Sequence, residues 1–351
     1  MNHQYYNVLG VMSGTSLDGV DIARVSLVRK ENWSFQIHET LSLPYPKNIL
    51  DKLKRAITMG SEDLSLFNIE YTQYLSLLIN DFIKKNAIHD LLAICSHGHT
   101  VHHRPEEGYT FQIGNLPALA RLTGHRVICD FRLADLSLGG QGAPLVPIGD
   151  QLLFAEYDYC LNLGGFANVS YEQNGHRVAF DICAVNVVLN HYAQKLGMEY
   201  DAGGAFAKAG TFNHTVLEKL NALEYYTLDA PKSLGIEWVN KQVFPLLKKI
   251  ENPSNALATY TEHAAQQISS IIPKGSKVLC TGGGSFNEFL MERVEKNSQI
   301  NPDIPNAQLI EFKEALIFAF LGVLRLRNEV NCLSSVTGAS HDHSSGKIFT
   351  P

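Results

Sequence analysis

The chain has 351 residues, of which 45% are apolar and 18% charged, and its formal net charge is −6. This length predicts two domains with sizeable cores. An acidic balance without a basic block argues against a nucleic-acid partner, and no apolar run approaches the ~20 residues that span a bilayer. The start of the chain lacks the pattern of a signal peptide. Six widely spaced cysteines without a C-x-x-C pair favour reduced thiols in the cytoplasm.

The first 130 residues are expected to contain both strands and helices. Strands are predicted at residues 7–12, 20–28, 34–43, 91–95 and 127–129. Helices are predicted at residues 47–59, 63–85 and 116–123, and the last of these ends at Gly124.

Residues 138–147 are rich in glycine and proline, so we expect an irregular segment that crosses between two lobes. Beyond it, strands are predicted at residues 159–163, 169–173, 178–183 and 277–280. Helices are predicted at residues 184–196, 253–272, 286–295 and 313–326. Residues 336–339 are expected to form a late strand and turn.

One pattern occurs twice. A strand, a turn of small residues and a second strand occupy residues 7–27 and again residues 159–173. Each copy opens a half of similar length, which predicts two similar α/β lobes that bind a phosphate chain between them. We place lobe I at residues 1–130 plus 333–351 and lobe II at residues 131–332.

The first of these turns carries the strongest chemical signal. Residues 10–21 read GVMSGTSLDGVD, with hydroxyl side chains, two flexible glycines and two carboxylates. Such a turn between strands presents several N–H donors to one anion. A Mg²⁺ ion would reconcile Asp18 with a phosphate. The alternative is a surface hairpin with a loose turn.

Two further segments contain candidate residues for the same phosphate-containing ligand. Asp181 follows the apolar run 178–180, where a carboxylate is either a general base or an ordinary helix N-cap. The second segment lies between a strand and a helix and contains Gly282, Gly283 and Gly284. Glycine there lets a ligand approach the backbone, although a tight turn alone would also need it.

Histidines are concentrated in residues 96–105, at His97, His99, His102 and His103. Within this cluster no cysteine or carboxylate offers a further ligand, so we favour polar substrate contacts from a loop over a metal site.

Three charged residues are candidates for substrate contacts. Arg104 and Arg132 are suited to bind a substrate carboxylate bidentately. Glu314 is either a first-turn partner of the helix dipole or a site carboxylate. Residues 139–144 are expected to be a hinge or a substrate loop.

In this order, the segments resemble the anhydro-N-acetylmuramic acid kinase family, which belongs to the sugar kinase, Hsp70 and actin superfamily. The resemblance covers nearly the whole chain, and its most specific motifs are residues 10–23 and GGQGAPLVP at residues 139–147. It implies an α/β protein with the two-lobed actin-like ATPase (ribonuclease H-like) fold. Each lobe would be a mixed sheet flanked by helices, with ATP in the interdomain cleft.

The resemblance implies an unusual phosphotransfer. Water would open 1,6-anhydro-N-acetylmuramic acid at C1 while ATP phosphorylates O6, giving N-acetylmuramic acid 6-phosphate and ADP in cell-wall recycling. Asp181 matches the family's catalytic base, which would take a proton from the water. The resemblance leaves open whether the protein forms a homodimer.

The other implied site residues fall into two sets. The residues implied to hold ATP and Mg²⁺ are Gly14, Thr15, Ser16, Leu17, Asp18, Gly19, Val20, Asp21, Gly164, Gly165, Gly282, Gly283 and Gly284, with Asp18 at the metal. The residues implied to bind the sugar are Ser13, His97, Thr100, Arg104, Arg132, Asn168 and Glu314.

The chain departs from the family's pattern in three places. Ile182-Cys183-Ala184-Val185 follows Asp181 where the family has Thr-Gly-Pro-Gly, so an earlier and more rigid helix is expected. His99 replaces a glutamine and His102 a tryptophan. Two alternatives therefore stay open: a kinase for another 1,6-anhydro sugar such as levoglucosan, and a non-catalytic actin-like nucleotide-binding protein.

Overall fold

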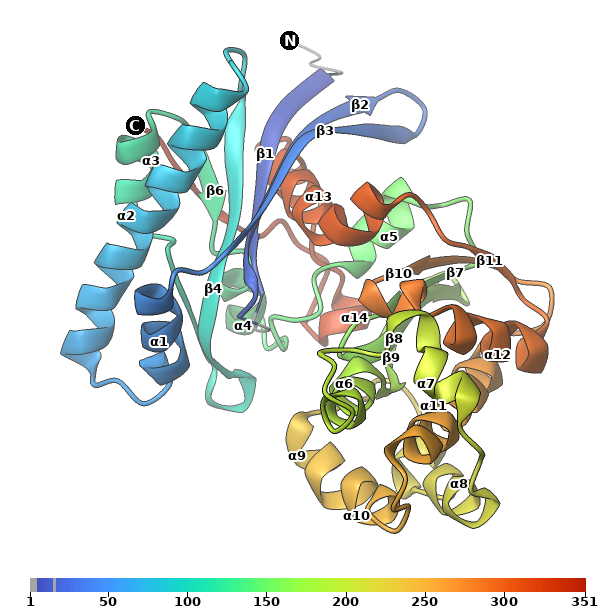
Figure 1. Cartoon of the computed structure of the whole chain (residues 1–351). Helices are drawn as coiled ribbons and strands as arrows, with labels where there is room; N and C mark the ends of the chain where they lie inside the picture. Colours follow the sequence, from blue (N-terminus) through green and yellow to red (C-terminus); the bar gives the residue numbers. More distant parts are fainter. Residues whose placement is uncertain (1–4, 15–16) are drawn as a thin grey trace. The chain divides into compact units, whose positions relative to one another are not determined.

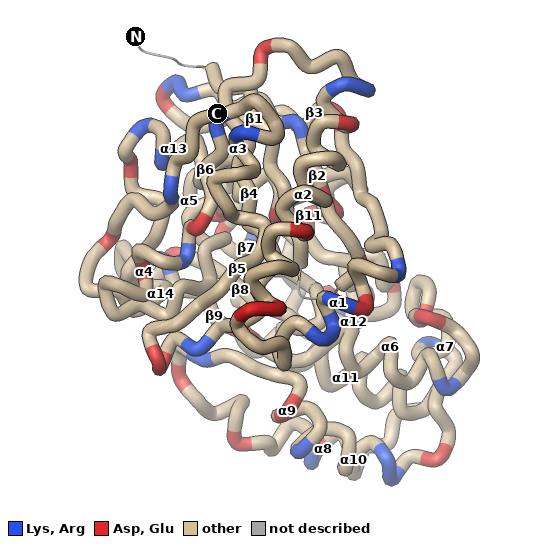
Figure 2. Tube along the Cα trace, turned by 90° about the vertical axis from the view of Figure 1, so that its left-hand side faces the viewer, with Lys and Arg blue, Asp and Glu red and all other residues tan. Residues whose placement is uncertain are grey.

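A computed structural model describes residues 5–14 and 17–351 of the chain. It contains two compact units, Met1–Leu153 with Phe312–Pro351, and Phe154–Glu311. Within the described ranges, no helix is both long and apolar enough to cross a membrane. Acidic and basic residues are interspersed along the chain (Figure 2), and some of them form surface pairs such as Lys47 with Asp51.

The first unit is built on a mixed sheet (Figure 1). Its strands are β1 (Tyr5–Ser13), β2 (Gly19–Arg29), β3 (Trp33–Pro44), β4 (Ala93–Arg104), β5 (Tyr109–Ile113), β6 (Val127–Cys129) and β12 (Lys347–Phe349). Their order is β12-β6-β4-β1-β2-β3, with β5 paired to β4. The strands β1, β2 and β3 are antiparallel neighbours, whereas β4 runs parallel to both β1 and β6.

Helices pack on this sheet because its central strands are apolar on both faces. The helices are α1 (Lys47–Ala56), α2 (Ser61–Lys85), α3 (Ala118–Thr123), α4 (Leu133–Ser137), α5 (Pro147–Leu153), α13 (Ala307–Leu326) and α14 (Ser334–Thr337). Leu9 and Val11 of β1 share one core with Phe67 and Tyr71 of α2. Side chains alternate along a strand, so Gly10 faces the other way, toward Ala315 of α13.

The contact between β1 and α13 gives a stability prediction. A Cβ atom at Gly10 would lie 1.9 Å from the backbone oxygen of Ala315, which cannot move without displacing the helix. We expect Gly10→Ala to lower the free energy of unfolding by about 3 kcal/mol, measured by urea denaturation. Gly60→Ala is the control, because nothing lies within 4 Å of that position and its φ is −66°. Equal stability of the two variants would contradict this packing.

The second unit repeats the plan of the first (Figure 1). Its strands are β7 (Tyr159–Leu163), β8 (Phe166–Gln173), β9 (His176–Ala184), β10 (Lys277–Thr281) and β11 (Asn301–Asp303), in the order β11-β10-β7-β8-β9. Its helices include α6 (Asn186–Gln194), α7 (Ala205–Ala209), α8 (His214–Asn221), α9 (Ile236–Trp238), α10 (Phe244–Leu247), α11 (Pro253–Ile271) and α12 (Glu288–Ser298). Eleven residues of α11 are buried, which makes it the central helix of this core.

Both units therefore share one topology. In each, three antiparallel strands are followed by two strands that run parallel to the first. This confirms the duplication that the repeated strand–turn–strand pattern predicted. The arrangement is that of the actin-like, ribonuclease H-like fold.

The chain passes between the units after Leu153 and after Glu311, not at residues 130 and 332 as we expected. The glycine- and proline-rich segment belongs to the first unit, because it is bonded there. The Gln141 N–H donates to the Thr337 carbonyl (2.8 Å), and the Gly142 N–H donates to Asp135 Oδ2 (2.6 Å).

Two other expectations about local structure are wrong. Residues 96–104 are not a loop but the second half of β4, because β5 supplies a paired neighbour. Residues 334–337 form the short helix α14, which ends at Gly338 in a left-handed conformation (φ 78°). Pairing partners distant in the chain decide both cases.

Candidate functional site

The strand β1 ends at Ser13, and β2 begins at Gly19. Thr15 and Ser16 lie outside the described residues. Leu17 has φ 65°, which is uncommon for a residue with a side chain, and conformations of this kind gather at ligand sites. The Asp18 side chain is exposed, whereas Val20 is buried. Asp18, and not Val20, is therefore accessible at this end of β2.

Ser13 ends β1 inside a buried group of hydroxyls. Its Oγ contacts the Tyr45 hydroxyl, the Tyr71 hydroxyl (2.8 Å) and His99 Nδ1 (3.0 Å). Burial lowers the pKa of His99 to about 4, so the ring is neutral at physiological pH. Sequence reasoning assigned no role in the site to Tyr45 or Tyr71. The contacts with Ser13 hold the end of β1 in place.

His97 and Arg132 form a second buried pair. Arg132 donates from Nε (3.2 Å) and Nη2 (2.9 Å) to His97 Nε2, and from Nη1 to the Gly142 carbonyl (2.7 Å). His97 Nδ1 lies 2.8 Å from the Gly98 carbonyl. Nδ1 must therefore carry the proton, and Nε2 accepts from the guanidinium. Burial, with the adjacent positive charge of Arg132, lowers the pKa of His97 to about 3.

Glu314 lies in the same electrostatic neighbourhood. Burial lowers the pKa of Arg132 to about 10, and the carboxylate of Glu314 opposes this change. Although water reaches Glu314, desolvation by the surrounding protein raises the pKa of its carboxyl group. Arg132 opposes that shift, whereas Asp21 and Asp18 add to it. The charge of Glu314 therefore depends on these three charged residues of the first unit.

Glu314 is not a partner of the helix dipole. The helix α13 begins at Ala307, and its first turn contains no acidic residue. Because the dipole effect is confined to the first turn, that alternative is wrong. The prediction of Glu314 as a site carboxylate remains.

The neutral state of His97 predicts a pH dependence of stability. The unfolded chain takes up a proton at this ring near pH 6.5, whereas the folded protein takes it up near 3. The free energy of unfolding therefore falls as the pH drops from about 6.5 toward 3. At pH 5 this amounts to about 2 kcal/mol for His97.

Urea denaturation at pH 7 and pH 5 measures this effect. We expect the loss of stability on acidification to be smaller by about 2 kcal/mol in His97→Gln than in the unmodified protein. His89→Gln is the control, because His89 is exposed. An equal loss in His97→Gln and the unmodified protein would contradict the assignment.

Thr100 and Arg104 lie farther along β4, where it pairs with β5. Thr100 accepts a bond from Gln112 Nε2 (3.3 Å), and Arg104 pairs with Glu107 (3.3 Å). Arg104 also lines an open cavity of about 470 Å³, whose other residues are Met59, Ser61, Leu64, Ser65, Asn68, His102, Tyr109 and Phe111. His97, Arg132 and Glu314 are not part of that cavity. In the described part of the chain, the four histidines do not gather into a metal-binding group.

In the second unit, the two glycine turns meet at the end of β7. Gly282 has φ 81°, and a Cβ there would lie 2.6 Å from Asn162 Oδ1. A Cβ at Gly284 would lie 2.8 Å from the Leu163 carbonyl. Gly283 alone has nothing within 4 Å. Packing thus explains two of these glycines, whereas Gly283 leaves its backbone open to a ligand.

The turn between β7 and β8 completes this edge of the sheet. It contains Gly164 and Gly165, whose carbonyls accept from the N–H groups of Asn186 (3.3 Å) and Val185 (2.8 Å). The Asn186 side chain donates to the Leu163 carbonyl (3.2 Å). The structure therefore brings the second small-residue turn beside the glycines after β10, as the resemblance implied.

Asp181 lies within β9, opposite Asn168 of β8. Its Oδ2 accepts from the Leu234 N–H (2.9 Å), and its carbonyl accepts from the Tyr225 hydroxyl (2.6 Å). Burial raises the pKa of the Asp181 carboxyl, and the bond from Leu234 opposes that change. Sequence reasoning missed Tyr225 and Leu234, which follow Asp181 by more than 40 residues. The Leu234 N–H orients the carboxylate, and the Tyr225 hydroxyl holds the backbone of the same residue.

The helix N-cap alternative for Asp181 is wrong, and so is the expected early helix. β9 continues to Ala184, and α6 begins only at Asn186, after Val185. The residues 182–185 are buried in the core. Their apolar side chains thus extend the strand, because they fill that core.

The sheet topology of the two units places the protein in the actin-like fold class. The family description "Anhydro-N-acetylmuramic acid kinase" matches residues 6–351, and the chain belongs to this family. A protein of that name from Saccharophagus degradans is 35% identical over 374 residues, covering 98% of each chain. Its namesake from Haemophilus influenzae is 34% identical over 385 residues, covering 99% of this chain and 98% of its own.

Proposed function

We propose that this protein is an ATP-dependent kinase that opens 1,6-anhydro-N-acetylmuramic acid with water and phosphorylates O6. The products are N-acetylmuramic acid 6-phosphate and ADP, which places the reaction in peptidoglycan recycling. The observation that carries this proposal is the family match over residues 6–351. The orientation of the Asp181 carboxylate, held by Leu234, adds a chemical reason.

Asp181 acts as the general base. A carboxyl group whose pKa is raised by burial is a stronger base than one in water. It takes a proton from the water that attacks C1, and the bond between C1 and O6 breaks. O6 then attacks the γ-phosphate, ADP leaves, and Asp181 returns its proton to solvent.

The turns are assigned to the nucleotide. Backbone N–H groups of residues 14–21 and of Gly164 and Gly165 bind the phosphates, and the open backbone at Gly283 contacts the rest of ATP. The exposed carboxylate of Asp18 suits Mg²⁺, which prefers oxygen ligands and retains several waters. The ion supplies charge neutralisation at the phosphate oxygens.

The sugar is assigned to polar and charged side chains. Arg132 holds the lactyl carboxylate, because a guanidinium forms charge-assisted bonds with carboxylates. Ser13, His97, Thr100, Arg104, Asn168 and Glu314 are the remaining proposed sugar contacts.

One assay tests the function. Purified protein is incubated with ATP, Mg²⁺ and 1,6-anhydro-N-acetylmuramic acid in ¹⁸O-labelled water. We expect ADP and a 6-phosphosugar with one ¹⁸O atom at C1, detected by mass spectrometry. Turnover of levoglucosan that is faster than that of 1,6-anhydro-N-acetylmuramic acid would favour a kinase for another anhydro sugar. Absence of product from folded protein that binds ATP would favour a non-catalytic nucleotide-binding protein.

The proposed role of Gly283 has its own test. A Cβ atom there has nothing within 4 Å, so we expect Gly283→Val to fold normally. We expect the KM for ATP to rise about tenfold or more, because the side chain would obstruct the nucleotide, an effect worth about 1.4 kcal/mol. Steady-state kinetics at saturating sugar measure it, with Gly60→Ala as the control. An unchanged KM would remove Gly283 from the nucleotide site.

A further inference from the structure

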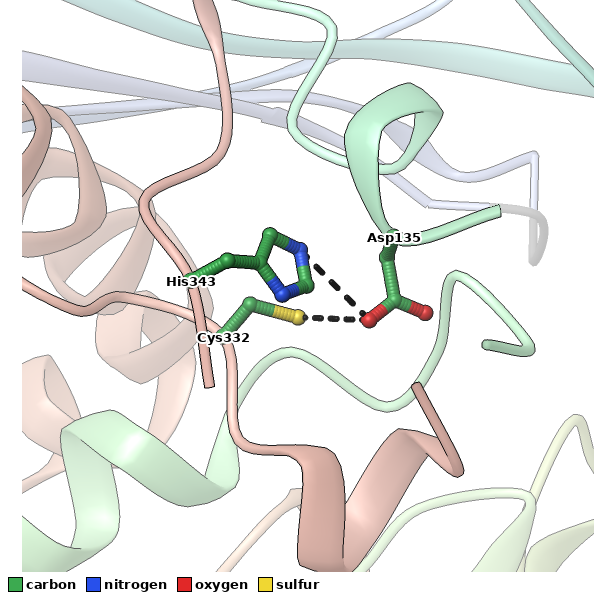
Figure 3. A group of neighbouring side chains, drawn as sticks. All are labelled: Asp135, Cys332 and His343. Carbon is green, nitrogen blue, oxygen red and sulfur yellow. Dashed lines mark hydrogen bonds and ion pairs between the residues drawn. The ribbon is translucent and has the colours of Figure 1, made fainter. Parts of the chain in front are cut away.

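Three side chains outside the proposed kinase site converge in the first unit. Asp135 of α4 lies beside Cys332 and His343 of the C-terminal segment, and Figure 3 shows their polar atoms pointing toward one another. Cys332 Sγ is 3.1 Å from Asp135 Oδ1, and His343 Nε2 is 3.6 Å from the same oxygen. One ligand atom from each residue lies within 4.8 Å of the other two.

The backbone places these groups before any ligand is present. Cys332 and His343 face each other across an antiparallel bridge, in which each N–H donates to the other's carbonyl at 3.1 Å. Asn331 reinforces the bridge by donating to the Ser345 carbonyl (2.8 Å) and accepting from its N–H (2.6 Å). The cysteine and histidine thus cannot separate unless this segment unfolds.

Proton positions leave His343 with an unused acceptor. Its Nδ1 lies 3.1 Å from the His341 carbonyl, so Nδ1 carries the proton and a neutral ring has a lone pair on Nε2. Nε2 has no hydrogen-bond partner among the described residues, although only 8% of the side chain is exposed. A buried lone pair that faces a carboxylate is costly unless a proton or a cation lies between them.

The carboxylate is also arranged for a cation. Asp135 is fully buried, and no lysine or arginine forms an ion pair with it among the residues that the structure describes. Its Oδ2 accepts from the Gly142 N–H (2.6 Å). Its Oδ1 faces Cys332, His343 and the Thr337 hydroxyl (2.7 Å). One oxygen is therefore committed to the backbone, and the other points into the cluster.

The separations fit tetrahedral zinc. Zinc lies about 2.0 Å from carboxylate oxygen and imidazole nitrogen and about 2.3 Å from sulfur, so a tetrahedral ion places oxygen about 3.3 Å from nitrogen and about 3.5 Å from sulfur. The observed distances from Oδ1 to Nε2 and Sγ, 3.6 and 3.1 Å, require only a small adjustment of the side chains. Sulfur, nitrogen and oxygen together are a ligand set typical of zinc.

We propose that Asp135, Cys332 and His343 bind one Zn²⁺ ion, with water or the Thr337 hydroxyl as the fourth ligand. Binding forms the Zn–S bond and releases the thiol proton of Cys332 to solvent. Burial raises the pKa of the free thiol, and the bound cation reverses this preference. The ion would fasten the C-terminal segment to α4 and to the loop at Gly142, which also accepts a bond from Arg132.

The test uses the full chain and two metals. Protein dialysed against a chelator is titrated with Zn²⁺ and, separately, with Co²⁺, and its metal content is measured by plasma mass spectrometry. We expect about one ion per chain, a rise in Tm with zinc, and a thiolate-to-cobalt charge-transfer absorption. That absorption should disappear in Cys332→Ser. The affinity should weaken more than about a hundredfold in His343→Gln.

His341→Gln is the matched control. His341 is an exposed neighbour in the same segment, and its replacement should leave metal binding unchanged. The proposal is overturned if the folded wild-type protein binds neither metal, or if the cobalt absorption persists in Cys332→Ser. The wild-type titration decides the question even if a variant does not fold.

Discussion

Asp181→Asn is expected to lower kcat for sugar phosphorylation by about 10²–10⁴-fold, the usual contribution of a general base. Asparagine has nearly the same shape and keeps an oxygen that can accept from the Leu234 N–H, but it cannot take a proton from water. Steady-state kinetics with 1,6-anhydro-N-acetylmuramic acid and ATP measure the effect. The KM for ATP should change little, because Asp181 is not assigned to the nucleotide.

The same variant should be as stable as the unmodified protein or more stable. The pKa of Asp181 is raised in the folded protein, so ionisation costs stability as the pH rises through the unfolded value of about 3.9. Asparagine removes that cost. The exposed Asp229 provides the control variant Asp229→Asn, which should keep full activity. If Asp181→Asn is folded and fully active, Asp181 is not the base.

Arg132→Gln is expected to lower kcat/KM for the muramic sugar by about 10–100-fold. A hydrogen bond to a charged group contributes about 1.5–3 kcal/mol, and the lactyl carboxylate would lose such a bond. The variant also leaves His97 Nε2 without its donor. Levoglucosan has no lactyl group, so its kcat/KM should fall less. The ratio of the two kcat/KM values therefore separates carboxylate binding from a general structural defect.

Arg104→Gln is the comparison for this experiment. Arg104 is exposed, pairs only loosely with Glu107, and lies at the open cavity rather than beside His97. We expect a smaller effect from it. If Arg104→Gln selectively impairs the muramic sugar and Arg132→Gln does not, the carboxylate is bound at that cavity.

Most strands and helices were predictable because their signals are local. The apolar runs of β1 and β7 and the helical spacing in α2 and α11 are properties of neighbouring residues. The repeated strand–turn–strand pattern also predicted that the two units share a topology, and the sheet orders confirm it.

The predictions of local structure and of domain boundaries failed where residues distant in the sequence determine the structure. The second half of β4 looked like a loop, because its polar residues form a strand only when β5 pairs with them. The domain boundaries were misplaced, because the segment 139–144 is tied to Thr337 and Asp135 by bonds that span many residues.

By itself, the sequence determined that the chain has two similar α/β lobes, since spacing and composition are sufficient for that. The resemblance to a family implied the actin-like fold. The sequence also singled out Asp181 as a candidate base. Only the tertiary structure decided that Asp181 lies inside a strand, half-buried beneath Leu234 and Tyr225. Likewise, only the structure joined Cys332 and His343 to Asp135. The physical reason is that desolvation and hydrogen bonding depend on which side chains meet, and these partners are 44 to 208 residues apart.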